Sequence, residues 1–218
     1  MEILYWILFI FGGFFLGSIM FCELIPKKIL HKDICEISVD NNPGAFNVFK
    51  HCGFKIGIPC LLLDGFKGLI PVLTASFLMD TNSIAFSLVL IAPVLGHAVG
   101  LFNRFHGGKC ITVSFGVMLG LIPVTWIGIV ALATLFVLFT AVIKIKPASK
   151  RSVIVYALFA ITVCPILGTL RLFYVMMGCG IIALIPVIKF IFSKNGMVEN
   201  NYHDISMDNE HTNEGNLR

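Results

Sequence analysis

The chain has 218 residues, of which 57% are hydrophobic and 13% are charged, and its formal net charge is +4. Soluble domains carry about 25% charged residues, so this composition excludes an ordinary soluble domain and indicates an integral membrane protein. So small a net charge does not indicate a nucleic acid as the partner.

Apolar segments long enough to cross a membrane occur along most of the chain. A helical crossing needs about 20 apolar residues. The first segment is too long for a signal peptide core and lacks a basic leader, so we expect a retained span. The apolar run 116–143 is too long for one crossing and predicts a hairpin near Pro123 to Gly128. We predict seven spans, at residues 3–22, 56–78, 83–102, 110–126, 127–143, 153–170 and 173–192.

The basic residues favour one orientation of these spans. Lysines and arginines follow the first, third, fifth and seventh spans, and the other connections carry only Arg171. The positive-inside rule then places the N-terminus outside and the C-terminus in the cytoplasm. The predicted fold is therefore an all-α bundle of about seven transmembrane helices. It forms one domain over residues 1–193, and the polar residues 194–218 are expected to be a disordered cytoplasmic tail.

The cysteines give no sign of a metal site or a disulfide framework. There are seven, an odd number, with no CxxC spacing, and most lie in apolar stretches. Cysteine in such places behaves as a small hydrophobic residue. We therefore predict no metal and no cofactor.

A polar stretch, DNNPGAFNVFK, runs from Asp40 to Lys50 in this otherwise apolar chain. Asn42 and Gly44 flank a proline, which is typical of a turn, and Asn47 lies one helical turn before Lys50. Amide side chains and a lysine can together hold a phosphate group. Taken alone, the stretch is explained better as a solvated turn.

A second polar stretch, Gly107-Gly108-Lys109, precedes the fourth predicted span. Glycines let a backbone approach a ligand closely, helix N-terminal amides attract anions, and the lysine adds a positive charge. The combination suits a phosphate. The motif by itself is short, and alone it favours a turn with an interfacial lysine.

Two charged residues lie well inside an apolar span, in the segment LLLDGFKGLIPV. Asp64 and Lys67 share one helix face because they are three residues apart. Isolated charges at mid-bilayer cost about 2.5–3.5 kcal/mol each, so we expect an ion pair, and we favour a functional role over a structural one. His97, near the end of the third span, is expected to pack against a neighbouring helix or to support a site.

Four segments together resemble one protein family, the bacterial acyl-phosphate:glycerol-3-phosphate acyltransferases. The segments are LGSIMF, DNNPGAFNVFK, LLLDGFKGLIPV and GHAVGLFNRFHGGK. They are similar to the family patterns GSIP, SGNxGATNVxR, LLLDxxKGxxPV and GHxFPxFxxFxGGKG in the same order. The resemblance is close over roughly the first 125 residues, and matched motifs at fixed spacing are far more specific than any one of them.

The resemblance implies a seven-span enzyme of the bacterial inner membrane with its site at the cytosolic face. Such an enzyme transfers a fatty acyl group from acyl phosphate to the 1-hydroxyl of glycerol 3-phosphate and makes lysophosphatidic acid. The implied partners are these two substrates, membrane lipid and an upstream enzyme that forms acyl phosphate. The family is thought to use the departing phosphate as proton acceptor, which fits the lack of a Ser-His-Asp-like set here.

Some positions depart from the family pattern. Asp40 stands where the family has serine, Lys50 where it has arginine and Phe46 where it has threonine. Cys110 replaces the glycine after GGK. The family's His-x-x-Asn pattern near the end of the last span aligns with a segment that begins at Phe192 and keeps only Asn195, so the histidine is missing.

These comparisons lead to a hypothesis for the site. Lys109 with the amides of Gly107 and Gly108 would bind one phosphate, and Lys50, Asn47, Asn42 and Gly44 would position the other. Asp64, Lys67, His97 and Asn195 would support them. Asp40 would repel an anion, although it could also act as a replacement base.

Two other functions remain open. One is a catalytically weak or inactive paralogue that binds a lipid phosphate or a partner enzyme. The other is a small transporter, which internal repeats and broken helices would favour, and the sequence shows neither.

Overall fold

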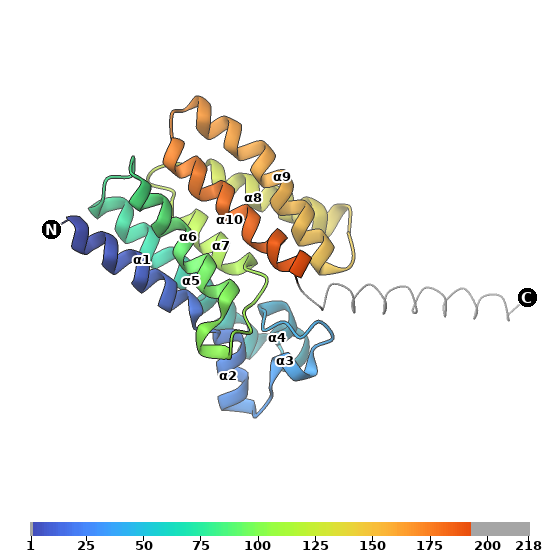
Figure 1. Cartoon of the computed structure of the whole chain (residues 1–218). Coiled ribbons are helices and arrows are strands. Elements are labelled where there is room, and N and C mark those ends of the chain that lie inside the picture. Colours follow the sequence, from blue (N-terminus) through green and yellow to red (C-terminus); the bar gives the residue numbers. More distant parts are fainter. Residues whose placement is uncertain (1, 193–218) are drawn as a thin grey trace, which may run out of the picture.

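The computed structural model describes residues 2–192, and these form an all-helical bundle (Figure 1). Ten α-helices are joined by one 3-10 turn, η1, at Leu101–Asn103 and by one π-helical turn, η2, at Leu138–Val142. The α-helices are α1 Glu2–Ser18, α2 Phe21–Leu30, α3 Ile34–Ile37, α4 Ala45–Cys52, α5 Phe54–Leu78, α6 Ile84–Val99, α7 Ile111–Gly120, α8 Ile127–Val137, α9 Ala148–Thr169 and α10 Phe173–Phe192.

Four of the described helices, α5, α6, α9 and α10, are long and apolar enough to cross a membrane, or five if the bent pair α1–α2 counts as one span. Their lipid-facing sides carry many exposed large hydrophobic residues. The prediction of an all-helical, multi-pass membrane protein is therefore confirmed, but that of seven full spans is not.

The difference arises in two places. The first predicted span is interrupted, because α1 ends at Ser18 and the chain turns by 43° into α2. The long apolar run does break between α7 and α8, at the predicted hairpin. However, α7 has only ten residues, which at 1.5 Å per residue is about half the thickness of the hydrocarbon layer.

Small residues allow the helices to pack closely. A Cβ added to Gly17 of α1 would lie 2.2 Å from the carbonyl oxygen of Pro93 in α6, and one added to Gly96 of α6 would lie 2.1 Å from that of Phe14. Close approach of backbones at small residues is the usual way that helices associate in lipid. The main apolar core then forms where α6, α7, α9 and α10 meet, around Phe86, Tyr156 and Phe159.

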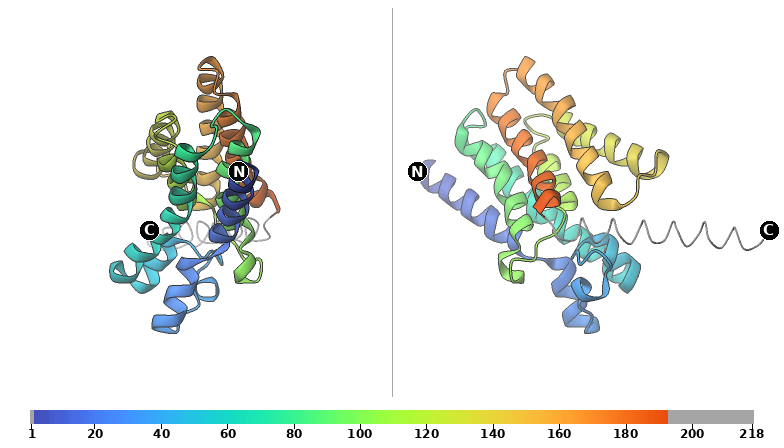
Figure 2. Two further views of the ribbon diagram at one scale, coloured as in Figure 1. Left: turned by 90° about the vertical axis from the view of Figure 1, so that its left-hand side faces the viewer. Right: turned by 45° about the vertical axis from the view of Figure 1, so that its right-hand side comes forward.

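The lysine-bearing connections gather at one end of this bundle. The group α2–α4, the connection between α6 and α7, and the end of α10 lie together there, whereas the α5–α6 and α9–α10 turns lie at the opposite end (Figures 1 and 2). Side-chain bonds join the first group: Lys32 donates to the carbonyl of His51, and Lys109 reaches Asp40 and Ser149. The two polar motifs of the sequence therefore lie side by side.

Candidate functional site

An ion pair joins the two polar motifs. Lys109 Nζ lies 2.7 Å from Asp40 Oδ2 and 3.3 Å from the hydroxyl of Ser149, at the start of α9. The side-chain amide of Asn47 donates to the other carboxylate oxygen of Asp40 at 2.8 Å. Three distant segments thus meet around one carboxylate and one ammonium group. Ser149 was not expected from the sequence, where it is one polar residue in a basic loop.

The turn before α4 positions Asn47. Asn47 Nδ2 also donates to the backbone carbonyl of Asn42 at 2.8 Å, and the same carbonyl accepts from the amide of Gly44, also at 2.8 Å. A Cβ on Gly44 would come within 2.4 Å of the Asn42 side-chain nitrogen, so a larger residue would push that side chain away. Asn42, Gly44 and Asn47 therefore form one small polar unit, which includes the turn expected from the sequence.

The environment of Asp40 keeps its carboxyl group ionised. Burial has the largest effect and would raise the pKa. The charge of Lys109 and the hydrogen bonds from Lys109 and Asn47 outweigh it, and the pKa of Asp40 falls below the ordinary value of 3.8. A carboxylate with a lowered pKa is a poorer proton acceptor near neutral pH. This argues against Asp40 as a general base.

The GGK loop is held against the end of α6. The Gly108 amide donates to the carbonyl of His97 at 3.1 Å, so in this structure that amide is engaged within the protein. Added Cβ atoms would lie 2.3 Å from His97 Nε2 at Gly108 and 2.2 Å from the Ala98 carbonyl oxygen at Gly107. Both glycines are thus required for packing on α6, and the buried His97 lies directly beneath the loop.

Lys189, in the last turn of α10, was missed by the sequence analysis. Its ammonium group donates to the carbonyls of Ala98, at 2.9 Å, and Gly107, at 2.5 Å. The sequence does indicate it, because Lys189 is a charged residue inside the apolar segment ALIPVIKFIF, and charged residues within spans usually have a specific partner.

The predicted ion pair inside the second span is present. Lys67 Nζ lies 2.8 Å from Asp64 Oδ1, and both side chains are buried. Lys67 also donates to the carbonyl of Ile19, in the break between α1 and α2, at 2.5 Å, and lies 5.9 Å from the centre of the Phe21 ring. The pair therefore connects α5 to that break.

Other predicted residues lie apart from this cluster or outside the described part. Lys50 lies exposed in the last turn of α4, and its side chain makes no hydrogen bond or ion pair to another residue within 2–192. Phe46 is 72% exposed and Phe192 is 82% exposed. Asn195 and the tail 194–218 lie outside the described residues.

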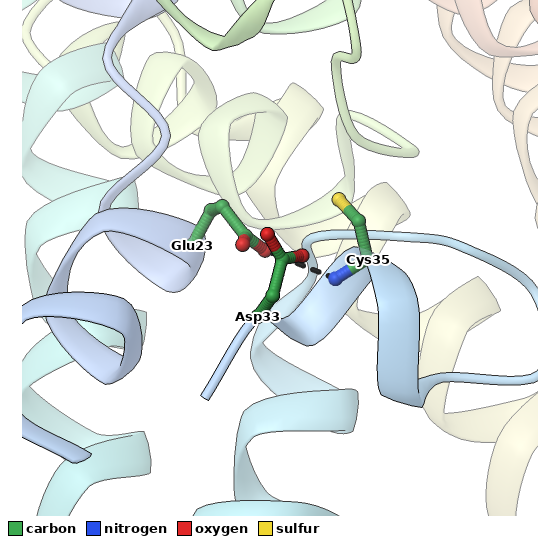
Figure 3. Close-up of side chains that lie close together, drawn as sticks. All are labelled: Glu23, Asp33 and Cys35. Atoms are coloured by element: carbon green, nitrogen blue, oxygen red, sulfur yellow. Dashed lines mark hydrogen bonds between the residues drawn. The ribbon is translucent and has the colours of Figure 1, made fainter. Parts of the chain in front are cut away.

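A group of possible metal ligands lies near this end of the bundle (Figure 3). The side chains of Glu23, Asp33 and Cys35 offer ligand atoms within 4.8 Å of one another. Both carboxylates already have partners: Glu23 accepts from the Cys35 amide, and Asp33 accepts from the Glu36 amide and pairs with Lys27. The bonds to the two backbone amides cap the start of α3. The other oxygen of Glu23, Oε1, is buried and has no hydrogen-bond partner within the described residues.

The motifs and the fold agree with comparisons to known proteins. A family model described as glycerol-3-phosphate acyltransferase matches residues 7–195. The chain is 41% identical over 119 residues to the glycerol-3-phosphate acyltransferase of Maridesulfovibrio salexigens, covering 55% of this chain and 60% of that relative. It is 39% identical over 135 residues to glycerol-3-phosphate acyltransferase 2 of Thermotoga maritima, covering 58% and 67%.

The fold has a solved counterpart. The crystal structure of PlsY (YgiH), an integral membrane glycerol 3-phosphate acyltransferase, in its glycerol 3-phosphate form, superimposes with a TM-score of 0.71. The two are 24% identical, and the match covers 85% of this chain and 88% of that one. Because the family model spans most of the chain, the resemblance seen in the four motifs is confirmed, and the protein belongs to the glycerol-3-phosphate acyltransferase family.

Proposed function

We propose that this protein transfers a fatty acyl group from acyl phosphate to the 1-hydroxyl of glycerol 3-phosphate. One observation carries the proposal beyond family membership: the DNNPGAFNVFK and GGK motifs, 69 residues apart at Asp40 and Lys109, meet at one end of the bundle. Relatives named glycerol-3-phosphate acyltransferase support the reaction. PlsY, solved in its glycerol 3-phosphate form, supports this acceptor.

The reaction needs mainly positioning and charge. The glycerol 3-phosphate oxygen forms a bond to the acyl carbonyl carbon, the bond from that carbon to the phosphate oxygen breaks, and inorganic phosphate leaves with the hydroxyl proton. Acyl phosphate is already a good acyl donor, so no covalent enzyme intermediate is required. The protein has to hold two anions close together and stabilise the negative charge on the carbonyl oxygen.

In our proposal Lys109 binds one phosphate, and the unit of Asn42, Gly44 and Asn47 faces the second substrate together with Lys50. In this structure the carboxylate of Asp40 forms an ion pair with the ammonium group of Lys109, at 2.7 Å. An anionic substrate must therefore compete with Asp40 for this charge. We infer that Asp40 weakens phosphate binding and is not the base.

We also propose an orientation and a setting. The end that carries the site would face the cytoplasm, where the lysine-rich connections favour it, and the N-terminus would lie outside. The membrane would be the bacterial inner membrane, where an upstream enzyme would supply acyl phosphate. Labelling of single cysteines placed at positions 28, 109, 150 and 80 tests this: the first three should react only from the cytoplasm, and position 80 only from outside.

A second candidate function is a paralogue that binds a phosphate-bearing lipid or a partner enzyme without turnover. The observations that favour it are the neutralised charge of Lys109 and the exposed Phe192 in place of the expected histidine. It would share the binding site but lack the reaction.

An assay of the purified protein separates these functions. We expect lysophosphatidic acid to form from glycerol 3-phosphate when acyl phosphate is the donor, and not with acyl-CoA or acyl carrier protein. A Lys109→Ala variant purified in parallel controls for contaminating activity. Product from acyl-CoA alone would reject the proposed donor, and no product from any donor, with binding of glycerol 3-phosphate retained, would favour the paralogue.

A further inference from the structure

The carbonyl groups at the end of α6 identify the role of Lys189. The last carbonyls of a helix have no partner within the helix and need one from elsewhere. In α6 the carbonyl of Gly96 accepts from the Gly100 amide at 2.8 Å, and that of His97 accepts from the Gly108 amide at 3.1 Å. The carbonyl of Ala98 accepts from Lys189 at 2.9 Å. Only the Gly100 amide belongs to the turn that ends α6; the Gly108 amide comes from the GGK loop, and Lys189 comes from α10.

The same ammonium group also holds the GGK loop. Lys189 Nζ donates to the carbonyl of Gly107, two residues before Lys109, across 82 positions in the sequence. One cation thus joins α10, the end of α6 and the loop. The partial negative charge at a helix C-terminus favours a cation in this place.

The loop is tight on its other side as well. The backbone of Gly107 lies so close to that of Ala98 that a Cβ would come within 2.2 Å, and Gly108 is in contact with the His97 ring. The two glycines therefore let the loop pack against the end of α6, and Lys189 holds it there through the carbonyls of Ala98 and Gly107. Removing the ammonium group would release the loop at Gly107, two residues before Lys109.

We propose that Lys189 is a positioning residue: by binding the carbonyls of Ala98 and Gly107 it sets the place of the GGK loop and of the Lys109 ammonium group. This inference rests on the proposed phosphate role of Lys109. Lys189 is not assigned a contact with substrate, because two of its three N–H groups already donate to carbonyls.

The first test measures the loop directly and does not depend on activity. Hydrogen–deuterium exchange of the purified protein, without substrate, should be faster in the segment 100–112 of Lys189→Met than in the wild type. Lys189→Arg, whose guanidinium group can donate to both carbonyls, should restore slow exchange. Lys55→Met, at an exposed lysine elsewhere on the same end, is the matched control. Unchanged exchange in Lys189→Met would overturn the inference.

The second test asks whether the loop position matters for the substrate. Lys189→Met should raise, by about fivefold or more, the KM of the same substrate whose KM rises in Lys109→Ala. The other substrate's KM should change much less. If Lys189 acts through Lys109, adding Lys189→Met to Lys109→Ala should cause little further loss, whereas independent roles would give additive losses and reject the inference.

The two tests also separate this inference from the proposed function. If Lys109→Ala leaves both KM values unchanged, the phosphate role of the loop is wrong, while faster exchange in Lys189→Met would still support its anchoring of the loop. If Lys189→Met does not fold in detergent, Lys189→Arg decides: wild-type exchange and KM support the inference, and a loss equal to that of Lys109→Ala rejects it.

Discussion

Two pairs of an aspartate and a lysine show how differently the same chemistry can be built. Asp64 and Lys67 are three residues apart on α5, and their side chains are at most 2% exposed. Asp40 and Lys109 are 69 residues apart on two connections, and their side chains are 16% and 21% exposed. The ion distances are nearly equal, at 2.8 and 2.7 Å. Distance alone therefore does not distinguish their roles.

The two ion pairs differ in how easily their charged groups can separate. A buried pair cannot be opened without leaving a charge in a medium that solvates it poorly, so Asp64 and Lys67 are expected to stay together. The partly exposed pair can open at a smaller cost, because water or an anion can replace the lost partner. We therefore propose structural anchoring for the first pair, in place of the functional role favoured from the sequence, and exchange with substrate for the second.

The largest expected effect comes from breaking the buried pair. Lys67→Met leaves the Asp64 carboxylate uncompensated, and we expect the free energy of unfolding to fall by about 3–5 kcal/mol. Asp64→Leu together with Lys67→Met should recover most of this loss, because no lone charge remains. Thermal unfolding in detergent measures both.

The double variant also tests the functional role that we favoured from the sequence. A stable but inactive double variant would show that Asp64 and Lys67 take part in the site, and a stable and active one would show that the site does not need them. Equal stability of Lys67→Met and the wild type would contradict the strong coupling expected of a buried pair.

The second prediction concerns Lys109, the lysine of the partly exposed pair. Lys109→Ala should lower kcat/KM at least tenfold, about 1.4 kcal/mol, because a charge-assisted bond to phosphate is lost. Its melting temperature should change little. Lys55→Ala, at an exposed lysine, is the matched control. Unchanged kinetics in a folded Lys109→Ala preparation would reduce the GGK motif to a turn.

The third prediction concerns the aspartate of the same pair. Asp40→Ser removes the anion that competes for Lys109, so we expect kcat/KM to rise about fivefold, the size of a partly exposed ion pair of about 1 kcal/mol. Lys50→Arg should add to the gain, because a guanidinium group binds phosphate through two bonds.

Asp40→Asn serves as a control that removes the charge but keeps the shape of the side chain. Loss of activity in both Asp40→Ser and Asp40→Asn would show that the carboxylate is needed and that the proposed competition has the wrong sign.

The smallest effect is expected from pH. Folding lowers the pKa of Asp40 below 3.8, the pKa of an ordinary aspartate. The stability that its pairing with Lys109 gives to the fold is therefore fully present above pH 3.8 and is lost only as the pH falls through the lower pKa of the folded state. Between pH 6 and 8 the charge of Asp40 is then constant. The pH profiles of the wild type and of Asp40→Ser should therefore have the same shape in this range, and a profile that changes shape would restore Asp40 as a base.

Much of the site was predictable because it is local. The turn at Asn42 to Gly44, the helix that presents Asn47 and the i, i+3 pair of Asp64 and Lys67 follow from turn chemistry and helix periodicity. These depend on residues a few positions apart. The apolar composition likewise determined a helical membrane protein, since lipid leaves backbone groups no partners outside a helix or a closed barrel.

Tertiary structure decided the rest. Which lysine meets Asp40, why Gly107 and Gly108 must be glycine, and where Lys189 places its charge all depend on the packing of α6, α7 and α10 around the loop. Hydropathy also could not show that α7 is short or that the first span bends after Ser18, because both are apolar throughout. Long-range contacts depend on how whole helix faces fit together, and no short sequence pattern encodes that fit.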